Sequence, residues 1–306
     1  MKEAVFQSSS LVRRFGNFTA VDHLNLELSK GDIFALVGQN GAGKTTLLKM
    51  ICGLILPTSG SMKLFGKSNA KGLGLARRRI GNIIETPGFY SYLSARQNLE
   101  YYRMQRGIKN KHCVEEALRF VGLDAGEKKF KNFSLGMKQR LGLALAILDN
   151  PDFLVLDEPI NGLDPMGIRE IREILLKLNH EKGTTILVSS HILGELSQIA
   201  TRYGFIKSGR LVESITAGEL EEKCRATLKI EVDDSAKAAD VLREGLSLPA
   251  VEILNDTSLQ LPGDFEHPEL AVKELVEAGV MVSQVYRTGV NLESYFINLI
   301  GGKNVD

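Results

Sequence analysis

The feature that most constrains this chain is the glycine-rich segment Gly38–Thr45, which reads GQNGAGKT. It follows the short apolar run Asp32–Val37 and fits the pattern GxxxxGK[ST]. In that pattern glycines let backbone N–H groups turn inward around a β-phosphate at the N-terminus of a helix. Lys44 would supply positive charge to the β- and γ-phosphates, and the Thr45 hydroxyl would ligate Mg²⁺. The alternative, a glycine-rich turn that merely caps a helix, is disfavoured by the position between a buried strand and a helix.

The phosphate site is expected to include residues on both sides of Lys44. The residues that we predict to bind the phosphate groups are Gly38, Asn40, Gly41, Ala42, Gly43, Lys44, Thr45 and Thr46.

Two further apolar runs end in polar residues that can carry chemistry. The runs 152–156 and 184–189 lack alternation, which is typical of strands buried on both faces of a parallel sheet. Asp157 and Glu158 follow the first run, and His191 follows the second. Ligands gather at the carboxyl ends of such strands, so these loops predict one shared site. There we expect Asp157 to hold the Mg²⁺ shell, Glu158 to polarise a water, and His191 to hydrogen-bond the γ-phosphate or that water.

The middle of the first half changes to a helical pattern. Apolar residues recur at helical spacing, with charged faces, in the segments 99–106, 111–121 and 135–148. We interpret residues 86–150, approximately, as a helical subdomain inserted into an α/β domain that spans residues 1–218.

From about residue 219 the loop motifs stop and a compact alternation of short elements begins. The predicted order β-α-β-β-α-β is that of a split-βαβ, ferredoxin-like unit. Its expected strands are 227–232, 251–254, 258–261 and 280–287, and its expected helices are 235–243 and 268–278. A final helix over 292–300 would end at Gly301 and Gly302. Residues 219–306 are therefore predicted to form a small α+β accessory domain.

Composition excludes several other classes of protein. The 38 Lys and Arg residues nearly balance the 37 Asp and Glu residues, so we expect no nucleic-acid partner. The longest apolar run, 141–148, is far shorter than the ~18 residues of a membrane span, and the N-terminus lacks a secretory signal. The three cysteines are odd in number and widely spaced, which favours a reducing cytoplasm over disulfides or a metal site.

Together these motifs resemble the ATP-binding subunit of an ABC transporter. The segment Ser134–Arg140, SLGMKQR, is similar to the family's signature loop, usually LSGGQ-x-QR, and Asn161–Pro165 resembles its D-loop. The resemblance implies that Ser134 and Gly136 contact the γ-phosphate held by a second subunit. Phe15 lies where the family stacks an aromatic ring on adenine; the alternative is a buried core aromatic.

What this resemblance implies is a peripheral ATPase subunit. Its fold would be the P-loop ABC-type ATPase domain, its cofactors ATP and Mg²⁺, and its active form a homodimer closed around ATP. It would drive a separate integral-membrane permease subunit from the cytoplasmic, inner face of the cell membrane.

The sequence departs from the family pattern at three positions. Leu135 and Met137 stand where glycine and glutamine are usual in the signature loop. Glu85 stands where the family has the glutamine that ligates Mg²⁺ and relays to the permease. Together with SLGMKQRLG, the C-terminal LIGG and a tail of similar length, Glu85 resembles the subgroup that exports bacitracin and lantibiotics. We therefore expect Glu85 to be a metal ligand and the cargo to be a peptide antibiotic; the alternative is a solvated Glu85 without a coupling role.

Two other functions remain open. One is a soluble ABC-type ATPase of translation or DNA repair, although this chain has neither a second ATP-binding domain nor long coiled coils. The other is a small-molecule P-loop kinase, which leaves the signature loop, the D-loop and His191 unexplained. An adjacent reading frame with about six hydrophobic spans would favour the transporter. The C-terminal domain either binds a ligand or only extends the dimer interface and braces the first domain.

Overall fold

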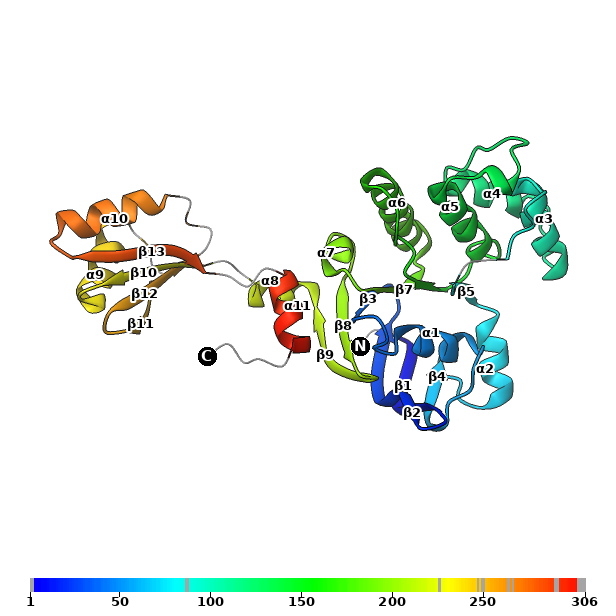
Figure 1. Ribbon diagram of the computed structural model, residues 1–306, viewed down its shortest axis with the longest axis horizontal. Helices are drawn as coiled ribbons and strands as arrows, with labels where there is room; N and C mark the ends of the chain where they lie inside the picture. The colour runs from blue at the N-terminus through cyan, green and yellow to red at the C-terminus, as the bar shows by residue number, and fades with distance from the viewer. Residues whose placement is uncertain are drawn as a thin grey trace. The chain divides into compact units, whose positions relative to one another are not determined.

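The computed structural model describes residues 3–85, 88–224, 227–246, 248, 251–262, 265, 267–288 and 292–301. The chain divides into two compact units, Met1–Ala217 and Gly218–Asp306. Figure 1 shows the elements of both, and each unit is described by itself below.

A six-stranded sheet forms the centre of the first unit, with the order β5-β6-β7-β3-β8-β9. Neighbouring strands are parallel from β5 to β8, and β9 is antiparallel to β8. Every residue of β3 and β7 is buried, and so are the first four of β6, which confirms the three predicted strands within two residues at each end. The strands are β3 (Ile33–Val37), β5 (Ile80–Ile83), β6 (Phe153–Asp157), β7 (Thr185–Ser190), β8 (Arg202–Lys207) and β9 (Arg210–Thr216).

A second, antiparallel sheet covers one side of this core, in the order β2-β1-β4. Its strands are β1 (Ala4–Phe15), β2 (Phe18–Ser29) and β4 (Ser59–Leu64). The sequence analysis did not predict this sheet. The pairing of β1 with β2 is interrupted by bulges, so burial along β1 does not alternate regularly, whereas residues 24–28 of β2 do alternate and could have revealed it.

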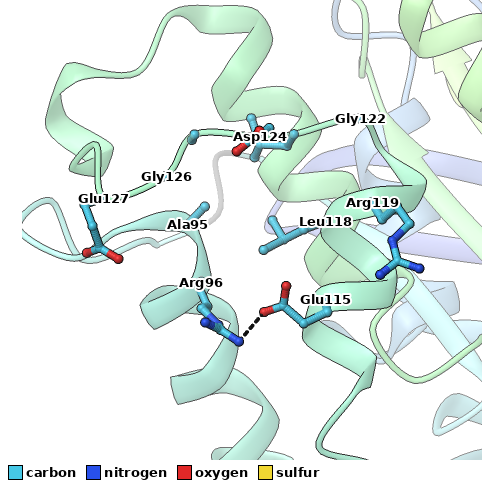
Figure 2. Close-up of a pocket in the computed structure, with 11 residues that line it drawn as sticks. Ala95, Arg96, Glu115, Leu118, Arg119, Gly122, Asp124, Gly126 and Glu127 are labelled. Atoms are coloured by element: carbon cyan, nitrogen blue, oxygen red, sulfur yellow. Dashed lines mark ion pairs between the residues drawn. The ribbon is translucent and has the colours of Figure 1, made fainter.

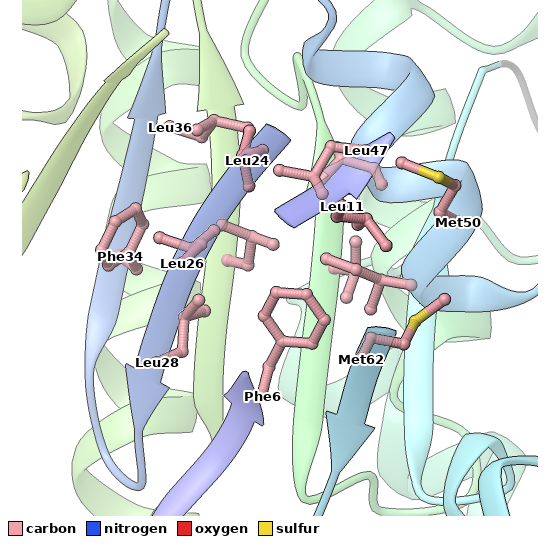
Figure 3. Packing of buried hydrophobic residues seen from close by; sticks show 14 of the residues in the cluster. Phe6, Leu11, Leu24, Leu26, Leu28, Phe34, Leu36, Leu47, Met50 and Met62 are labelled. Carbon is pink, nitrogen blue, oxygen red and sulfur yellow. The ribbon is translucent and has the colours of Figure 1, made fainter. Parts of the chain in front are cut away.

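Helix α1 (Lys44–Cys52) packs between the two sheets. Figure 3 shows the shared core, to which Phe6 of β1, Leu24 of β2, Leu36 of β3 and Leu47 of α1 all contribute side chains. These four side chains are fully buried. Because both sheets and α1 bury their apolar faces in one cluster, the N-terminus of α1 is held at the carboxyl end of β3.

The predicted helical subdomain is present as α3 (Ala95–Gln105), α4 (Cys113–Phe120) and α5 (Leu135–Ala146), with a short 3₁₀ turn at Phe130–Asn132. Helix α3 begins four residues before its predicted start. Its N-cap is Ser94, whose side chain accepts from the Gln97 backbone while the Gln97 side chain accepts from the Ser94 backbone. This capping box could have been read from the sequence S-A-R-Q. The other helices of this unit are α2 (Ala70–Arg77), α6 (Pro165–Lys182) and α7 (Leu193–Leu196).

The second unit has the element order β-α-β-β-α-β, flanked by two further helices. Its antiparallel sheet has the order β11-β12-β10-β13, which is the split-βαβ arrangement. Its own core joins the sheet to α9 and α10, and Ile230 and Leu242 are fully buried there. The elements are α8 (Ala217–Lys223), β10 (Thr227–Val232), α9 (Ser235–Gly245), β11 (Glu252–Asn255), β12 (Ser258–Pro262), α10 (Pro268–Glu277), β13 (Val282–Thr288) and α11 (Leu292–Gly301).

Two sequence expectations concern the chain's end and its relation to membranes. The cap predicted at Gly301 and Gly302 extends to residue 302, which lies outside the described residues. None of the helices in the described ranges combines the length and the apolar character that crossing a bilayer requires.

The two separate cores predict separate responses to mutation. Ile230→Ala should destabilise the second unit by about 2–5 kcal/mol, because it leaves a cavity at a fully buried position. Ile253→Ala, at a site 44% exposed on β11, is the matched control and should cost less than about 1 kcal/mol. Amide hydrogen exchange, recorded at increasing denaturant concentration, measures the free energy of unfolding of each unit. Equal destabilisation of the first unit by Ile230→Ala would contradict independent cores.

Candidate active site

The glycine-rich loop is held in place by close backbone approaches. Gly43, the residue before α1, has φ 105°, in the region that favours glycine. A Cβ atom there would lie 2.3 Å from the carbonyl oxygen of Ala20 on β2. At Gly38 a Cβ atom would lie 2.6 Å from Ile206 on β8. These two glycines therefore let the loop pack directly against strands of both sheets.

Lys44 is the first residue of α1, and its side chain folds back under the loop. Its Nζ donates to the carbonyl oxygens of Gly38, at 2.5 Å, and Gln39, at 3.3 Å. The side chain is only 6% exposed, and its Nζ lies 3.3 Å from Oε1 of Glu158. The structure thus brings together the predicted cation of the loop and the predicted base.

Asp157 joins the ends of three segments. As the last residue of β6 it accepts hydrogen bonds from two hydroxyls, Thr45 Oγ1 at its Oδ2 and Ser189 Oγ at its Oδ1, both at 2.7 Å. Ser189 also accepts a hydrogen bond of 3.0 Å from the backbone N–H of Glu158. Ser189 was missed by the sequence analysis. Its signal is a hydroxyl directly after the apolar run 186–188, opposite Asp157 on the neighbouring strand.

Glu158 and His191 form the other half of the site. Oε2 of Glu158 lies 2.8 Å from Nδ1 of His191, which makes an ion pair only when the imidazole is protonated. Glu158 has φ 49°, an uncommon conformation for a residue other than glycine. Its carboxylate therefore lies between Lys44 and His191, while the adjacent Asp157 binds Thr45.

Another carboxyl group lies close to this pair. Glu195, in the short helix α7, lies with Oε2 at 3.5 Å from the Ser190 hydroxyl. Burial raises the pKa of Glu195 above its ordinary value; the charge of His191 opposes this rise, and that of Glu158 adds to it.

Glu85 follows β5 and also has a positive φ, of 64°. It lines a cavity of about 320 Å³ together with Asp157 and Glu158, so the structure brings these carboxylates to one place. Its Oε1, however, pairs with Nζ of Lys49 on α1 at 2.5 Å rather than with Thr45. The Glu85 side chain is 67% exposed.

Phe15 ends strand β1, directly opposite Phe18 across a tight hairpin. Its side chain is 45% exposed, so the alternative of a buried core aromatic is wrong. The guanidinium carbon of Arg13 lies 4.4 Å from the ring centroid, and Arg13 also donates to the carbonyl oxygen of Leu56. A flat aromatic surface braced by a cation suits a stacked base.

Ser134 and Gly136 lie at the start of α5. The Ser134 hydroxyl accepts from the Met137 backbone N–H at 3.3 Å and caps the helix, and Ser134 is exposed. Among the hydrogen bonds of the described residues, none joins Ser134 or Gly136 to the glycine-rich loop of the same chain. Leu135, which stands between these two residues, lines the cavity that Glu85 and Glu158 also line.

A second cavity of about 490 Å³ lies elsewhere in the helical subdomain (Figure 2). Arg96 of α3 and Glu115 of α4 form a 2.7 Å ion pair across it, and the loop 122–127 closes its rim. None of the predicted site residues lines this cavity, so we do not assign the phosphate chemistry to it.

Comparisons with known proteins agree with this geometry. The sequence profile of the family described as ABC transporter matches residues 21–161. The bacitracin transport ATP-binding protein BcrA of Enterococcus faecalis is 41% identical over 304 residues, which is 99% of this chain and 98% of that protein. The lantibiotic transport ATP-binding protein SrtF of Streptococcus pyogenes is 42% identical over 204 residues, covering 66% of this chain and 87% of that protein.

Among solved structures, cbiO1 from Clostridium perfringens, part of the ABC transporter complex cbiONQ, matches with a TM-score of 0.65 and 26% identity. The match covers 72% of this chain and 92% of that chain. Fold and sequence agree with the resemblance first drawn from the motifs: the chain belongs to the ABC transporter family, as an ATP-binding subunit with the ATPase activity of that family.

Proposed function

We propose that this subunit hydrolyses ATP to drive a separate integral-membrane permease that exports a peptide antibiotic such as bacitracin or a lantibiotic. It would act as a homodimer through ATP, at the cytoplasmic, inner face of the cell membrane. The observation that carries the cargo class is the similarity to BcrA, which extends over nearly the whole length of both chains. A soluble ABC-type ATPase without a transport role has less support, because the named relatives are transport proteins.

The oxygen atoms at the N-terminus of α1 and at the end of β6 fit Mg²⁺. A threonine hydroxyl and a carboxylate are the hard oxygen ligands that Mg²⁺ prefers, and Thr45 Oγ1 lies 2.7 Å from Asp157 Oδ2. We assign the metal to Thr45 and Asp157, with Glu85 as a further ligand. Bound there with ATP, Mg²⁺ would neutralise charge on the β- and γ-phosphates.

The chain's own groups can carry out the hydrolytic step. Lys44 would donate to the phosphate oxygens that replace its present carbonyl contacts, and the loop's N–H groups would surround the β-phosphate. Glu158 would accept a proton from a water molecule while the water oxygen attacks the γ-phosphorus. The bond between the γ-phosphorus and the oxygen that bridges it to the β-phosphate would then break, and ADP would leave. His191 contacts Oε2 of that carboxylate, and the other oxygen, Oε1, which lies beside Lys44, would face the γ-phosphate.

Composite sites shared by two subunits would explain the position of the signature residues. Ser134 is exposed at the N-terminus of α5, where the helix offers free N–H groups to an anion. The γ-phosphate bound by a second copy is a suitable anion. Phe15 would stack on the adenine of the ATP bound by its own copy. Ser134 and Gly136 would complete the site of the other copy.

Replacing the loop lysine tests the phosphate site. Lys44→Ala should lower ATP hydrolysis at least ~10³-fold, because the loop has no other fixed cation for the transferring phosphoryl group. Steady-state phosphate release measures this, and Lys71→Ala, an exposed lysine on α2, is the control. Near-normal activity of Lys44→Ala would refute the assignment of the loop.

Glu158→Gln tests the base. The amide keeps the shape of the side chain and loses the proton acceptor, so ATP binding should persist while hydrolysis stalls. With ATP and Mg²⁺, the variant should elute as a dimer on size exclusion, and Glu181→Gln, an exposed residue on α6, should not. If Glu158→Gln hydrolyses ATP at the normal rate, another group is the base.

Glu85→Ala tests the coupling to the permease. Cells that carry this variant with its permease should lose peptide-antibiotic resistance, while the isolated subunit loses ATPase activity only several-fold. The reason is that the variant removes a ligand that moves with the metal but leaves Thr45, Asp157 and Glu158 in place. Immunoblotting controls for expression, and full resistance at equal expression would leave Glu85 without a coupling role.

A further inference from the structure

Glu85 is held by a partner that lies outside the predicted chemistry. Lys49 of α1 pairs its Nζ with Glu85 Oε1 at 2.5 Å. The Lys49 side chain is 30% exposed, whereas that of Glu85 is 67% exposed. The sequence analysis gave Lys49 no role, because this residue follows the glycine-rich motif and is not one of the residues that the motif specifies.

The position of Lys49 on its helix relates it to the metal site. Thr45 and Lys49 are four residues apart on α1, so they lie on the same face, one turn from each other. One turn of helix is about 5.4 Å along the axis. Thr45 is hydrogen-bonded to Asp157, the other assigned ligand. The residue that binds the Glu85 carboxylate thus stands one helical turn from Thr45, an assigned ligand of Mg²⁺.

We propose that Lys49 provides a second binding position for the Glu85 carboxylate, which exchanges between Lys49 and Mg²⁺ bound at Thr45 and Asp157. Lys49 is then a positioning residue that competes with the metal for Glu85. This inference rests on the proposed function of the site. It explains why a glutamate suits this position, because the glutamine usual in the family could not form the ion pair.

The charges around the cavity favour this exchange in both directions. Asp157 and Glu158 line the same cavity as Glu85, and their negative charges disfavour a third carboxylate beside them. Lys138 also lines that cavity and partly offsets them. A divalent cation at Asp157 reverses the local charge and attracts Glu85. The charge balance therefore moves Glu85 toward Lys49 without the metal and toward Thr45 with it.

The strength of the ion pair sets the size of the expected effect. Exposed ion pairs contribute little free energy, so the competition is worth a factor of about three in the apparent affinity for the metal complex. An ion pair of that strength binds the Glu85 carboxylate in the absence of Mg²⁺ and is weak enough for Mg²⁺ to displace Lys49. Much stronger pairing would keep the carboxylate from the metal.

The test compares the affinity for a fluorescent, non-hydrolysable ATP analogue in Mg²⁺ and in EDTA. The measured quantity is the Kd in EDTA divided by the Kd in Mg²⁺. Lys49→Met should raise this ratio about threefold, because Glu85 no longer has to leave a partner. In a Glu85→Gln background, Lys49→Met should leave the ratio unchanged, because the carboxylate for which Lys49 competes is absent. This double-mutant cycle separates the competition from any general effect of the lysine charge on ATP binding.

Two further variants control the cycle. Lys49→Arg keeps an ion pair and should retain the wild-type ratio, which separates the pairing from a packing defect in α1. Lys71→Met removes an exposed lysine charge from α2 and should also leave the ratio unchanged. An unchanged ratio for Lys49→Met, or an equal change in both backgrounds, would overturn the inference alone. A wild-type protein that does not bind the analogue would overturn the proposed function and the inference together.

Discussion

The site depends on the two hydrogen bonds accepted by Asp157. One comes from Thr45, 112 residues away along the chain, and the other from Ser189, 32 residues away. Partly buried carboxylates need such donors, and bonds to an ionised group are stronger than neutral ones. Because Asp157 and Ser189 are direct neighbours in the sheet, the register of β6 and β7 fixes where Thr45 can bind. The hydrogen bonds of Asp157 thereby link the N-terminus of α1 to the carboxyl ends of β6 and β7.

The turn at Glu158 gives two adjacent acids different partners. Successive residues of a regular strand point to opposite faces of the sheet, so a continued β6 would direct Glu158 away from Asp157. The left-handed backbone at Glu158, with φ 49°, ends the strand instead. Its carboxylate then lies between Lys44 and His191, at the same edge as Asp157. Such conformations carry a cost of about 1–3 kcal/mol and persist where the surrounding contacts hold them.

It could be predicted that Lys44, Asp157, Glu158 and His191 share one site, because parallel strands place their carboxyl ends at one edge of the sheet. Local sequence predicts the strands, and the topology then brings their ends together. The pairing of Lys49 with Glu85 could not be predicted in this way. It joins a helix face to a residue after an edge strand, and the contact depends on a left-handed φ at a glutamate, which local sequence does not favour. The sheet of β1, β2 and β4 was missed although residues 24–28 of β2 alternate; only along β1 do bulges disrupt the alternation.

All the residues that we propose to bind ATP and Mg²⁺ lie between Phe15 and His191, within the first unit. The buried cluster around α1 and the buried cluster of the second unit have no residue in common. A substitution that leaves a cavity in one core therefore does not loosen the other directly. A substitution within the core of the second unit therefore removes neither the Thr45–Asp157 hydrogen bond nor any side chain of the cluster around α1.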